Sequence, residues 1–321
     1  MSTMLFVSCR KDFWSAMDFA TTNAIRRIDF DTGAAMPISH RAFVNELTNK
    51  RVTVLVHGYN NEELDVIDSY RTIDTQMRTL EFLGSANGAP YHALVGFAWP
   101  GGAIGVSFPF ARQRAAESAA LFSNVLSDLR SAGATVDLNT HSLGAHVVFE
   151  ALREDPANAV RNAWNFASAV DNESIEFNER YFQASQRCTK FYVFHSKHDP
   201  VLRVWYRIGD FFDFDTALGY TGPEDPAAII AHSPHVQVVN CKGVVTSHGG
   251  YRSAGQVWAH MSRELATPSA AQFVTLEKTP QILNAEFAAA GGMLLATRTR
   301  LPARRATGRP KRSTRTTGRR R

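Results

Sequence analysis

The sequence predicts an α/β protein built around a mostly parallel sheet, and three observations support this fold class. Short runs rich in Val, Ile and Phe alternate along the chain with longer segments of helical period. Several of these runs lack polar alternation, as do strands that are covered on both faces. The chain of 321 residues is 44% hydrophobic and 20% charged, which is enough apolar material for a large core.

The predicted strands are apolar runs bounded by turn residues. They are Met4–Ser8, Val52–His57, Ala93–Trp99, Thr135–Thr140, Ala163–Ala169, Phe191–His195 and Val236–Cys241. Helical segments lie between them at Leu64–Leu83, Arg112–Ser131 and Gly144–Arg153. In the second segment, apolar residues recur at three- and four-residue steps, as in an amphipathic helix packed on a sheet. We therefore expect helices on both faces of a central sheet.

Residues 201–234 interrupt this alternation. The segment contains Trp205, Phe211 and Phe212 among Asp and Gly residues, and it is too long for an ordinary connection and too aromatic for a solvated loop. It precedes Val236–Cys241, the last predicted strand. We expect a lid-like aromatic insertion in which these three side chains bind the substrate. The alternative is a satellite core that binds no ligand.

The positive charge of the chain is concentrated at one end. Residues 298–321 contain eleven Lys or Arg and no acidic residue, whereas residues 1–297 contain 24 basic and 30 acidic residues. The 298–321 segment is also poor in large apolar residues, so we expect a disordered basic tail after a single domain at 1–297. Such a tail can bind polyanions without sequence preference. The alternative is a solvated extension that contacts nothing.

Other features of the sequence bear on location and cofactors. Cys9, Cys188 and Cys241 are odd in number and show no CxxC spacing, which argues against a disulfide framework or a zinc knuckle. The longest apolar run, 287–296, is about half the length of a membrane span, and the N-terminal charges follow the apolar stretch instead of preceding it. We expect a cytoplasmic protein without a membrane span. The oligomeric state stays open.

The sequence contains no motif for a nucleotide or a metal. A P-loop is absent, and Pro100 stands where the dinucleotide fingerprint begins with glycine. His195, His198 and Asp199 superficially suggest metal ligands, but they have no further partner at ligand spacing. We expect neither a cofactor nor a metal.

The segment that is most informative about chemistry is Thr135–Leu152, where a strand runs directly into a helix through His141-Ser142-Leu143-Gly144. A serine at such a corner projects its hydroxyl from the carboxyl edge of the sheet. Gly144 supplies the small residue that the turn needs, whereas Thr140 stands where the G-x-S-x-G pattern has its first glycine. Ser142 is thus a candidate nucleophile, although an ordinary N-cap serine is the alternative.

Loops at the ends of other strands complete a candidate site. In a serine-nucleophile site of this architecture, two backbone N–H groups bind the oxyanion, and by position these belong to Tyr59 and Leu143. Asp199 follows one downstream strand and His248 follows the next, which gives the order serine, acid, histidine. Asp171, one strand earlier, is an alternative acid.

At this point the chain resembles the α/β-hydrolase family, and more narrowly a bacterial branch with uncharacterised substrates. The resemblance covers about Met4 to Leu265. It rests on LVHGYN at 55–60, FAWPG at 97–101, THSLG at 140–144, HDP at 198–200 and SHG at 247–249.

The resemblance implies roles for three residues. Ser142 would be the nucleophile, His248 the general base and then acid, and Asp199 the carboxylate that orients His248. It implies an α/β-hydrolase fold and hydrolysis of a small carboxylic ester or thioester through an acyl-enzyme on Ser142, without a cofactor. Two alternatives are an acyltransferase with the same triad and a binding protein on this scaffold with a polyanion-binding tail.

Overall fold

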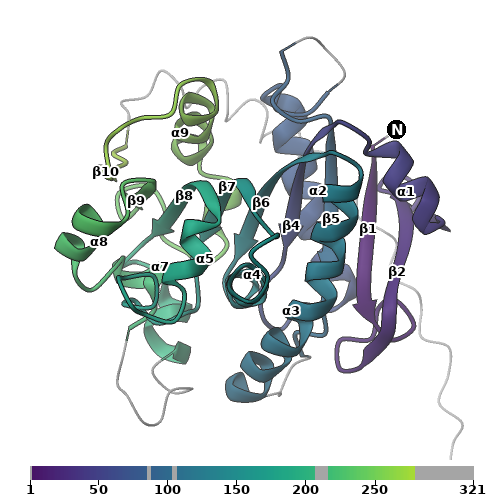
Figure 1. Ribbon diagram of the computed structural model, residues 1–321, viewed down its shortest axis with the longest axis horizontal. Helices are drawn as coiled ribbons and strands as arrows, with labels where there is room; N and C mark the ends of the chain where they lie inside the picture. The colour runs from purple at the N-terminus through teal and green to yellow at the C-terminus, as the bar shows by residue number, and fades with distance from the viewer. Residues whose placement is uncertain (1, 85–87, 103–106, 207–215, 279–321) are drawn as a thin grey trace, which may run out of the picture. The chain divides into compact units, whose positions relative to one another are not determined.

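The computed structural model describes residues 2–84, 88–102, 107–206 and 216–278. Within these residues, ten strands form one sheet in the order β10-β9-β8-β7-β6-β4-β5-β1-β2-β3 (Figure 1). The β1–β2 and β2–β3 pairs are antiparallel, and every other neighbouring pair in this order is parallel. The predicted mostly parallel sheet is confirmed.

The strands follow the chain with helices between them. Their bounds are β1 Thr3–Arg10, β2 Phe19–Asp29, β3 Ala35–Pro37, β4 Arg51–Val56, β5 Ala93–Ala98, β6 Thr135–His141, β7 Val160–Phe166, β8 Cys188–His195, β9 Val236–Asn240 and β10 Phe273–Thr275. The helices are α1 His40–Glu46, α2 Glu63–Thr79, α3 Phe108–Ser131, α4 Gly144–Glu154, α5 Phe182–Gln186, α7 Leu218–Thr221, α8 Pro226–His232 and α9 Gly255–Ala266, with short helices η1 Leu202–Tyr206 and η2 Gly250–Arg252.

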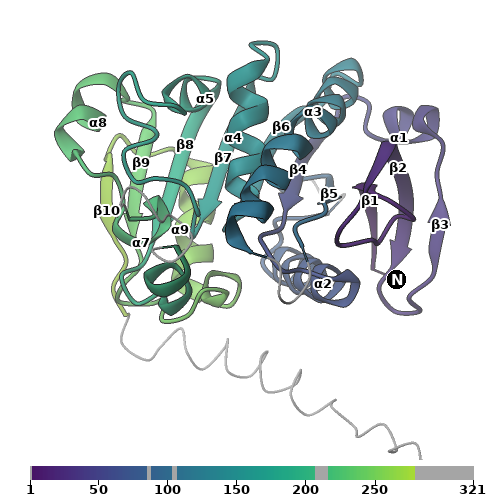
Figure 2. The same ribbon diagram turned by 90° about the horizontal axis from the view of Figure 1, so that it is seen from below.

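The helices form two layers around the sheet. Helices α3 and α4 cover one face, and α2 and α9 cover the other (Figure 2). In α3, the buried positions include Ala115, Ala119, Phe122 and Leu129, so one stripe faces the sheet as its periodicity predicts. Helix α4 is buried along its length from Gly144 to Leu152, as expected for a helix in the middle of a layer. The expectation of helices on both faces is therefore confirmed.

Three strands were not predicted, and one was predicted out of place. Strand β2 consists mostly of exposed or half-buried residues, with Ile25 and Ile28 buried, because it lies near an edge of the sheet. Strands β3 and β10 have only three residues each, too few for a pattern. Strand β7 ends at Phe166, three residues earlier than expected, because Ala167 takes φ 50° and breaks the extended backbone.

The segment 201–234 is the crossover from β8 to β9. Its described part contains η1, α7 and α8, and Leu218 of α7 is fully buried. Gly219 lies directly against the backbone of Ala167, where a Cβ would clash. This part of the segment therefore packs on the sheet. Phe211 and Phe212 lie outside the described residues, as does the side chain of Trp205.

Two further expectations fall on residues at the end of the chain. The proposed boundary at 297 and the basic tail at 298–321 lie outside the described residues, which end at 278. Among the residues that are described, no helix is both long and apolar enough to cross a membrane.

The topology places a switch point at the carboxyl ends of β4 and β6. The chain leaves β4 through α2 on one face, and it returns from β5 to β6 through α3 on the other face. Strands β4 and β6 are parallel neighbours, so the loops that follow them leave the same edge of the sheet. These loops lead to opposite faces, because β4 is followed by α2 and β6 by α4. Ligands of open α/β sheets bind at such a switch point.

Two glycines allow these loops to touch. A Cβ on Gly144 would lie 2.6 Å from the Val56 carbonyl oxygen, and one on Gly58 would lie 2.7 Å from Ser142 Cβ. Neither distance is available to real Cβ atoms, and at Gly144 the obstructing atoms belong to the backbone of β4 and its loop. The start of α4 can therefore approach β4 only because residue 144 has no side chain.

We predict that Gly144→Ala destabilises the protein by about 1 to 3 kcal/mol, because one methyl group must push two packed backbone segments apart. Urea unfolding of the full chain measures the change in midpoint. The matched control is Gly249→Ala, where the added methyl group meets no backbone and lies 3.1 Å from the end of the Arg252 side chain. Equal midpoints for the two variants would contradict the proposed backbone constraint.

Candidate active site

Ser142 lies at the turn between β6 and α4 with a left-handed backbone. Its φ is 55°, a conformation that costs a non-glycine residue about 1 to 2 kcal/mol. Hydrogen bonds hold the residue there: its N–H donates to the Phe166 carbonyl at 2.9 Å, and its carbonyl accepts from Ala145 and Ala169. The strain is therefore imposed by the surrounding sheet, as at many functional turns.

Thr140 fits this turn although the pattern has glycine at its position. Its side chain is fully buried, and its hydroxyl donates to Asn165 Oδ1 of β7 at 3.0 Å. The threonine therefore points along the sheet into a satisfied polar contact. The departure from the G-x-S-x-G pattern leaves the corner intact.

Asp199 and His248 meet at the same edge of the sheet. Asp199 Oδ2 accepts a hydrogen bond from His248 Nδ1 at 2.7 Å, and Asp199 Oδ1 accepts from the amides of Val201 and Leu202. The Asp199 side chain is 0% exposed and that of His248 is 19% exposed. The buried carboxylate is thus fully bonded, and it orients an imidazole that still reaches solvent.

His141 supports the loop that carries His248. Its Nε2–H donates to the His248 backbone carbonyl at 2.8 Å, and the two rings lie 4.6 Å apart between centroids. Burial, and after it the neighbouring charges of His248 and Arg252, lower the pKa of His141 well below its ordinary value. His141 is therefore neutral at physiological pH and adds no positive charge beside His248.

The loop after β4 passes next to the Ser142 hydroxyl. The position of a Cβ on Gly58 is 3.3 Å from Ser142 Oγ, and Tyr59 follows directly. The Leu143 N–H donates no hydrogen bond within the described part of the chain. Among the same residues, no hydrogen bond joins Ser142 Oγ to the His248 ring.

Sequence reasoning missed Arg10, a fully buried arginine at the end of β1. Its Nε donates to the Trp99 carbonyl at 2.8 Å, and its Nη2 donates to the Asn61 carbonyl at 2.7 Å and to His57 Nε2 at 3.1 Å. Burial lowers the pKa of Arg10 to about 10, so the guanidinium stays charged at neutral pH. It joins the loops that follow β4 and β5.

His57 completes this junction as a neutral ring. Its Nδ1–H donates to the Gly58 carbonyl at 2.8 Å, and its Nε2 accepts from Arg10 and from the Trp99 N–H. The ring stacks on Trp99 at an interplanar angle of 8°. Burial, followed by the charge of Arg10, lowers the pKa of His57 well below its ordinary value. The position of Arg10 at the carboxyl end of an apolar run was the signal that could have identified it.

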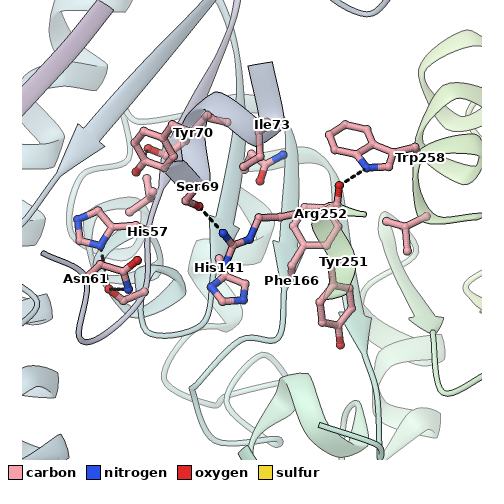
Figure 3. A pocket seen from close by; sticks show the side chains of 15 residues that line it. His57, Asn61, Ser69, Tyr70, Ile73, His141, Phe166, Tyr251, Arg252 and Trp258 are labelled. Atoms are coloured by element: carbon pink, nitrogen blue, oxygen red, sulfur yellow. Dashed lines mark hydrogen bonds between the residues drawn. The ribbon is translucent and has the colours of Figure 1, made fainter. Parts of the chain in front are cut away.

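A pocket opens beside this junction, on the face of the sheet that α2 and α9 cover (Figure 3). Gly58 and His141 form its border with the Ser142 turn. Its other walls come from β4, β6, α2, η2 and α9, and they include Leu55, Asn139, Ser69, Arg252 and Trp258.

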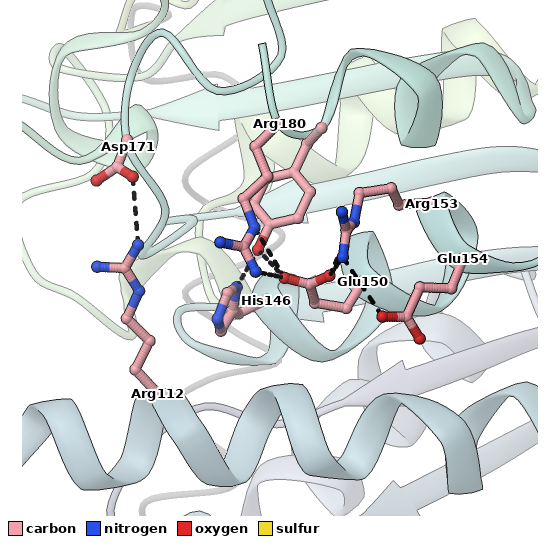
Figure 4. A network of polar contacts seen from close by, with 8 residues as sticks. Arg112, His146, Glu150, Arg153, Glu154, Asp171 and Arg180 are labelled. Atoms are coloured by element: carbon pink, nitrogen blue, oxygen red, sulfur yellow. Dashed lines mark hydrogen bonds and ion pairs between the residues drawn. The ribbon is translucent and has the colours of Figure 1, made fainter.

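Asp171, the alternative acid, faces a different partner. Its Oδ2 lies 3.3 Å from Arg112 Nη2 of α3 (Figure 4). The geometry therefore brings His248 to Asp199, while Asp171 belongs to a group of polar contacts that links the loop after β7 to α3.

A buried glutamate anchors α4 beside this group. Glu150 pairs with Arg180 and Arg153, and Tyr181 donates to it at 2.8 Å (Figure 4). Tyr181 also contacts His146, whose pKa burial lowers to about 4. These contacts hold α4 to the segment before α5. Neither Asp199 nor His248 takes part in them.

The residues that superficially suggested metal ligands do not converge. His195 is buried in β8, His198 is exposed, and both Asp199 oxygens are used by His248 and by backbone amides. Within the described ranges, no group of three or more His, Cys, Asp or Glu is arranged to hold a metal ion.

Several solved structures are similar to this chain. One is the poly(3-hydroxybutyrate) depolymerase LpqC from Bordetella parapertussis, at 16% identity and TM-score 0.34, covering 88% of this chain and 93% of that one. Another is a puromycin-hydrolyzing peptidase from Mycobacterium tuberculosis, at 14% identity and TM-score 0.34, covering 80% of this chain and 46% of that one. A third is the peroxisomal alpha-beta-hydrolase Lpx1 from Saccharomyces cerevisiae, at 11% identity and TM-score 0.31, covering 96% and 92%.

A comparison with curated protein sequences finds no significant match. A family model described as "Alpha/beta hydrolase of unknown function (DUF900)" matches residues 37–240, which is more than half of the chain. The match includes Ser142 and Asp199 and ends before His248. The chain therefore belongs to this family of α/β-hydrolases.

Proposed function

We propose that the protein is a serine hydrolase that cleaves a carboxylic ester or thioester through an acyl-enzyme on Ser142. The observation that carries the proposal is the 2.7 Å bond between Asp199 and His248, formed at the sheet edge where Ser142 is held with φ 55°. A serine hydroxyl is a weak nucleophile, and a neutral imidazole that can take its proton makes it reactive. The carboxylate holds the tautomer and stabilises the imidazolium that results.

In the proposed reaction, Ser142 Oγ attacks the carbonyl carbon as His248 Nε2 takes the hydroxyl proton. The amides of Tyr59 and Leu143 bind the developing oxyanion, a contribution of about 3 kcal/mol each. The bond to the leaving group then breaks, and His248 gives its proton to the departing alkoxide or thiolate. Water repeats the sequence on the acyl-enzyme, which releases the acid and restores Ser142.

We predict that the protein hydrolyses p-nitrophenyl butyrate and that Ser142→Ala lowers the rate by about 10⁴ or more. Release of p-nitrophenolate measures the rate, and labelling by a fluorophosphonate reports the reactive serine independently. Ser262→Ala, at an exposed position of α9, is the control and should leave both readouts unchanged. Equal rates or equal labelling in wild type and Ser142→Ala would refute the assignment.

We predict that Asp199→Asn lowers turnover by roughly 10³ to 10⁴, because an amide can hold the wrong tautomer and cannot stabilise the imidazolium. Asp171→Asn should have a much smaller effect, because its carboxylate faces Arg112. Steady-state kinetics on p-nitrophenyl butyrate compares the two variants. If Asp171→Asn were the more damaging change, the acid would come from the loop after β7.

Acyl transfer to an alcohol is a second reaction open to the same residues. If an alcohol is added during turnover, acyl transfer forms a new ester, whereas hydrolysis forms only the acid.

We propose separately that the basic tail at 298–321 binds polyanions, since it contains eleven cationic residues and no acidic residue.

Deletion of residues 298–321 should remove retention on heparin resin and leave ester turnover within about twofold at moderate salt, where distant charges are screened. Salt elution and p-nitrophenyl butyrate kinetics measure the two effects. Retention of the truncated chain would place the polyanion site on residues 1–297.

A further inference from the structure

Arg252 brings a positive charge to the pocket beside Ser142. The residue ends η2, and its Nη1 donates to Ser69 Oγ of α2 at 2.9 Å (Figure 3). Its Nε is buried without a hydrogen-bond partner in the described part of the chain. No carboxylate in those residues forms an ion pair with it. Burial lowers the pKa of Arg252 below its ordinary value.

A comparison with Arg10 shows that the described residues leave hydrogen-bond donors of the Arg252 guanidinium unfilled. Arg10 is fully buried, and its guanidinium donates to three backbone carbonyls and to His57. Arg252 is half-buried, and within the described residues its guanidinium donates only to the Ser69 hydroxyl, which an uncharged side chain could also do. A partly buried charge with unused donors is costly unless a ligand completes it.

The rest of the pocket suits a small anionic group at the end of a short chain. Asn139 of β6 is 6% exposed, lines the pocket, and has no side-chain hydrogen bond among the described residues. Leu55, Ile73 and Trp258 supply apolar wall. The space in which the centre of a water molecule can lie is about 30 Å³, which is room for roughly two or three waters, or one carboxylate.

The pocket begins next to the proposed nucleophile. Gly58 lines it, and a Cβ at Gly58 would lie 3.3 Å from Ser142 Oγ. His141 lines it as well, and this ring donates to the His248 carbonyl. A group held by Arg252 is therefore close to an acyl group bound at Ser142.

We propose that this pocket binds a carboxylate of the substrate through Arg252 and Asn139, so that the favoured substrates are esters or thioesters whose acyl part ends in a carboxylate. The guanidinium supplies a positive charge and N–H donors for the carboxylate oxygens, and the Asn139 side-chain amide adds a further donor. The assignment of the carboxylate to a substrate rests on the proposed function, whereas the binding of a carboxylate does not.

Calorimetry on the full chain tests the site without catalysis. Butyrate is the probe, and butyramide is its uncharged counterpart of similar shape. We expect butyrate to bind at least about tenfold more tightly, as for a charge-assisted hydrogen bond. Arg252→Gln should abolish this preference, and Arg252→Lys should retain part of it. Arg263→Gln, at an exposed position of α9, is the matched control. It removes one arginine outside the pocket, so it should bind butyrate as wild type does.

Asn139→Asp provides a second variant if Arg252→Gln fails to fold. It nearly preserves shape and places a negative charge in the pocket, so it should also remove the preference for butyrate, with the melting temperature as the check on folding. A preference that survives in either folded variant, or is absent in wild type, would overturn the proposal.

Kinetics then connects the site to the reaction. Arg252→Gln should lower kcat/KM for monomethyl succinate at least about tenfold and leave methyl butyrate within about twofold. Equal losses on both esters would overturn the specificity role. Binding of butyrate through Arg252 in a protein that hydrolyses neither ester would refute the proposed function and leave the carboxylate site standing.

Discussion

The close approach of α4 to the end of β4 is the constraint on which the rest of the site depends. Gly144 allows the helix to begin against the Val56 carbonyl, and Gly58 allows the next loop to pass beside Ser142. Because both contacts involve backbone, small shifts in the sheet cannot relieve them. The left-handed turn at Ser142 is therefore a consequence of packing, and its hydrogen bonds to Phe166, Ala169 and Ala145 distribute the strain over β7, the loop that follows it and α4.

Arg10 extends this rigidity from the turn to the neighbouring loops. A buried charge without a carboxylate is costly unless its donors are filled, and here carbonyls of Trp99, Trp14 and Asn61 fill them together with His57. Each of these acceptors belongs to a loop that leaves the same edge of the sheet. The guanidinium thus requires the loops after β1, β4 and β5 to keep one arrangement, and Tyr59 lies in one of them.

Local signals predicted the central sheet and the order of the candidate site residues. Apolar runs identified β1 and β4 to β9, and the candidate residues lie in the connections after these strands: Ser142 directly after β6, and Asp199 and His248 in the loops that follow β8 and β9. Strand β2, next to the edge strand β3, was missed because most of its residues are exposed or half-buried, and β10 because it has three residues. Arg10 and Arg252 were missed for another reason. Their importance comes from what surrounds them in space, and an arginine in a sequence usually marks exposed surface.

The proposed reaction and the proposed carboxylate site draw on different parts of the fold. Ser142, Asp199 and His248 follow strands of one sheet, and backbone contacts hold their loops. Arg252 and part of the lining of its pocket come from α2, η2 and α9, whereas the rest of the lining comes from β4, the loop after it, β6 and β7. Side chains of α2 and α9, such as Ile73 and Trp258, lie outside the contacts of β4, β7 and α4 that hold the turn at Ser142. Under the proposed function, substitutions at these helix positions change the choice of substrate and leave the turn at Ser142 in place.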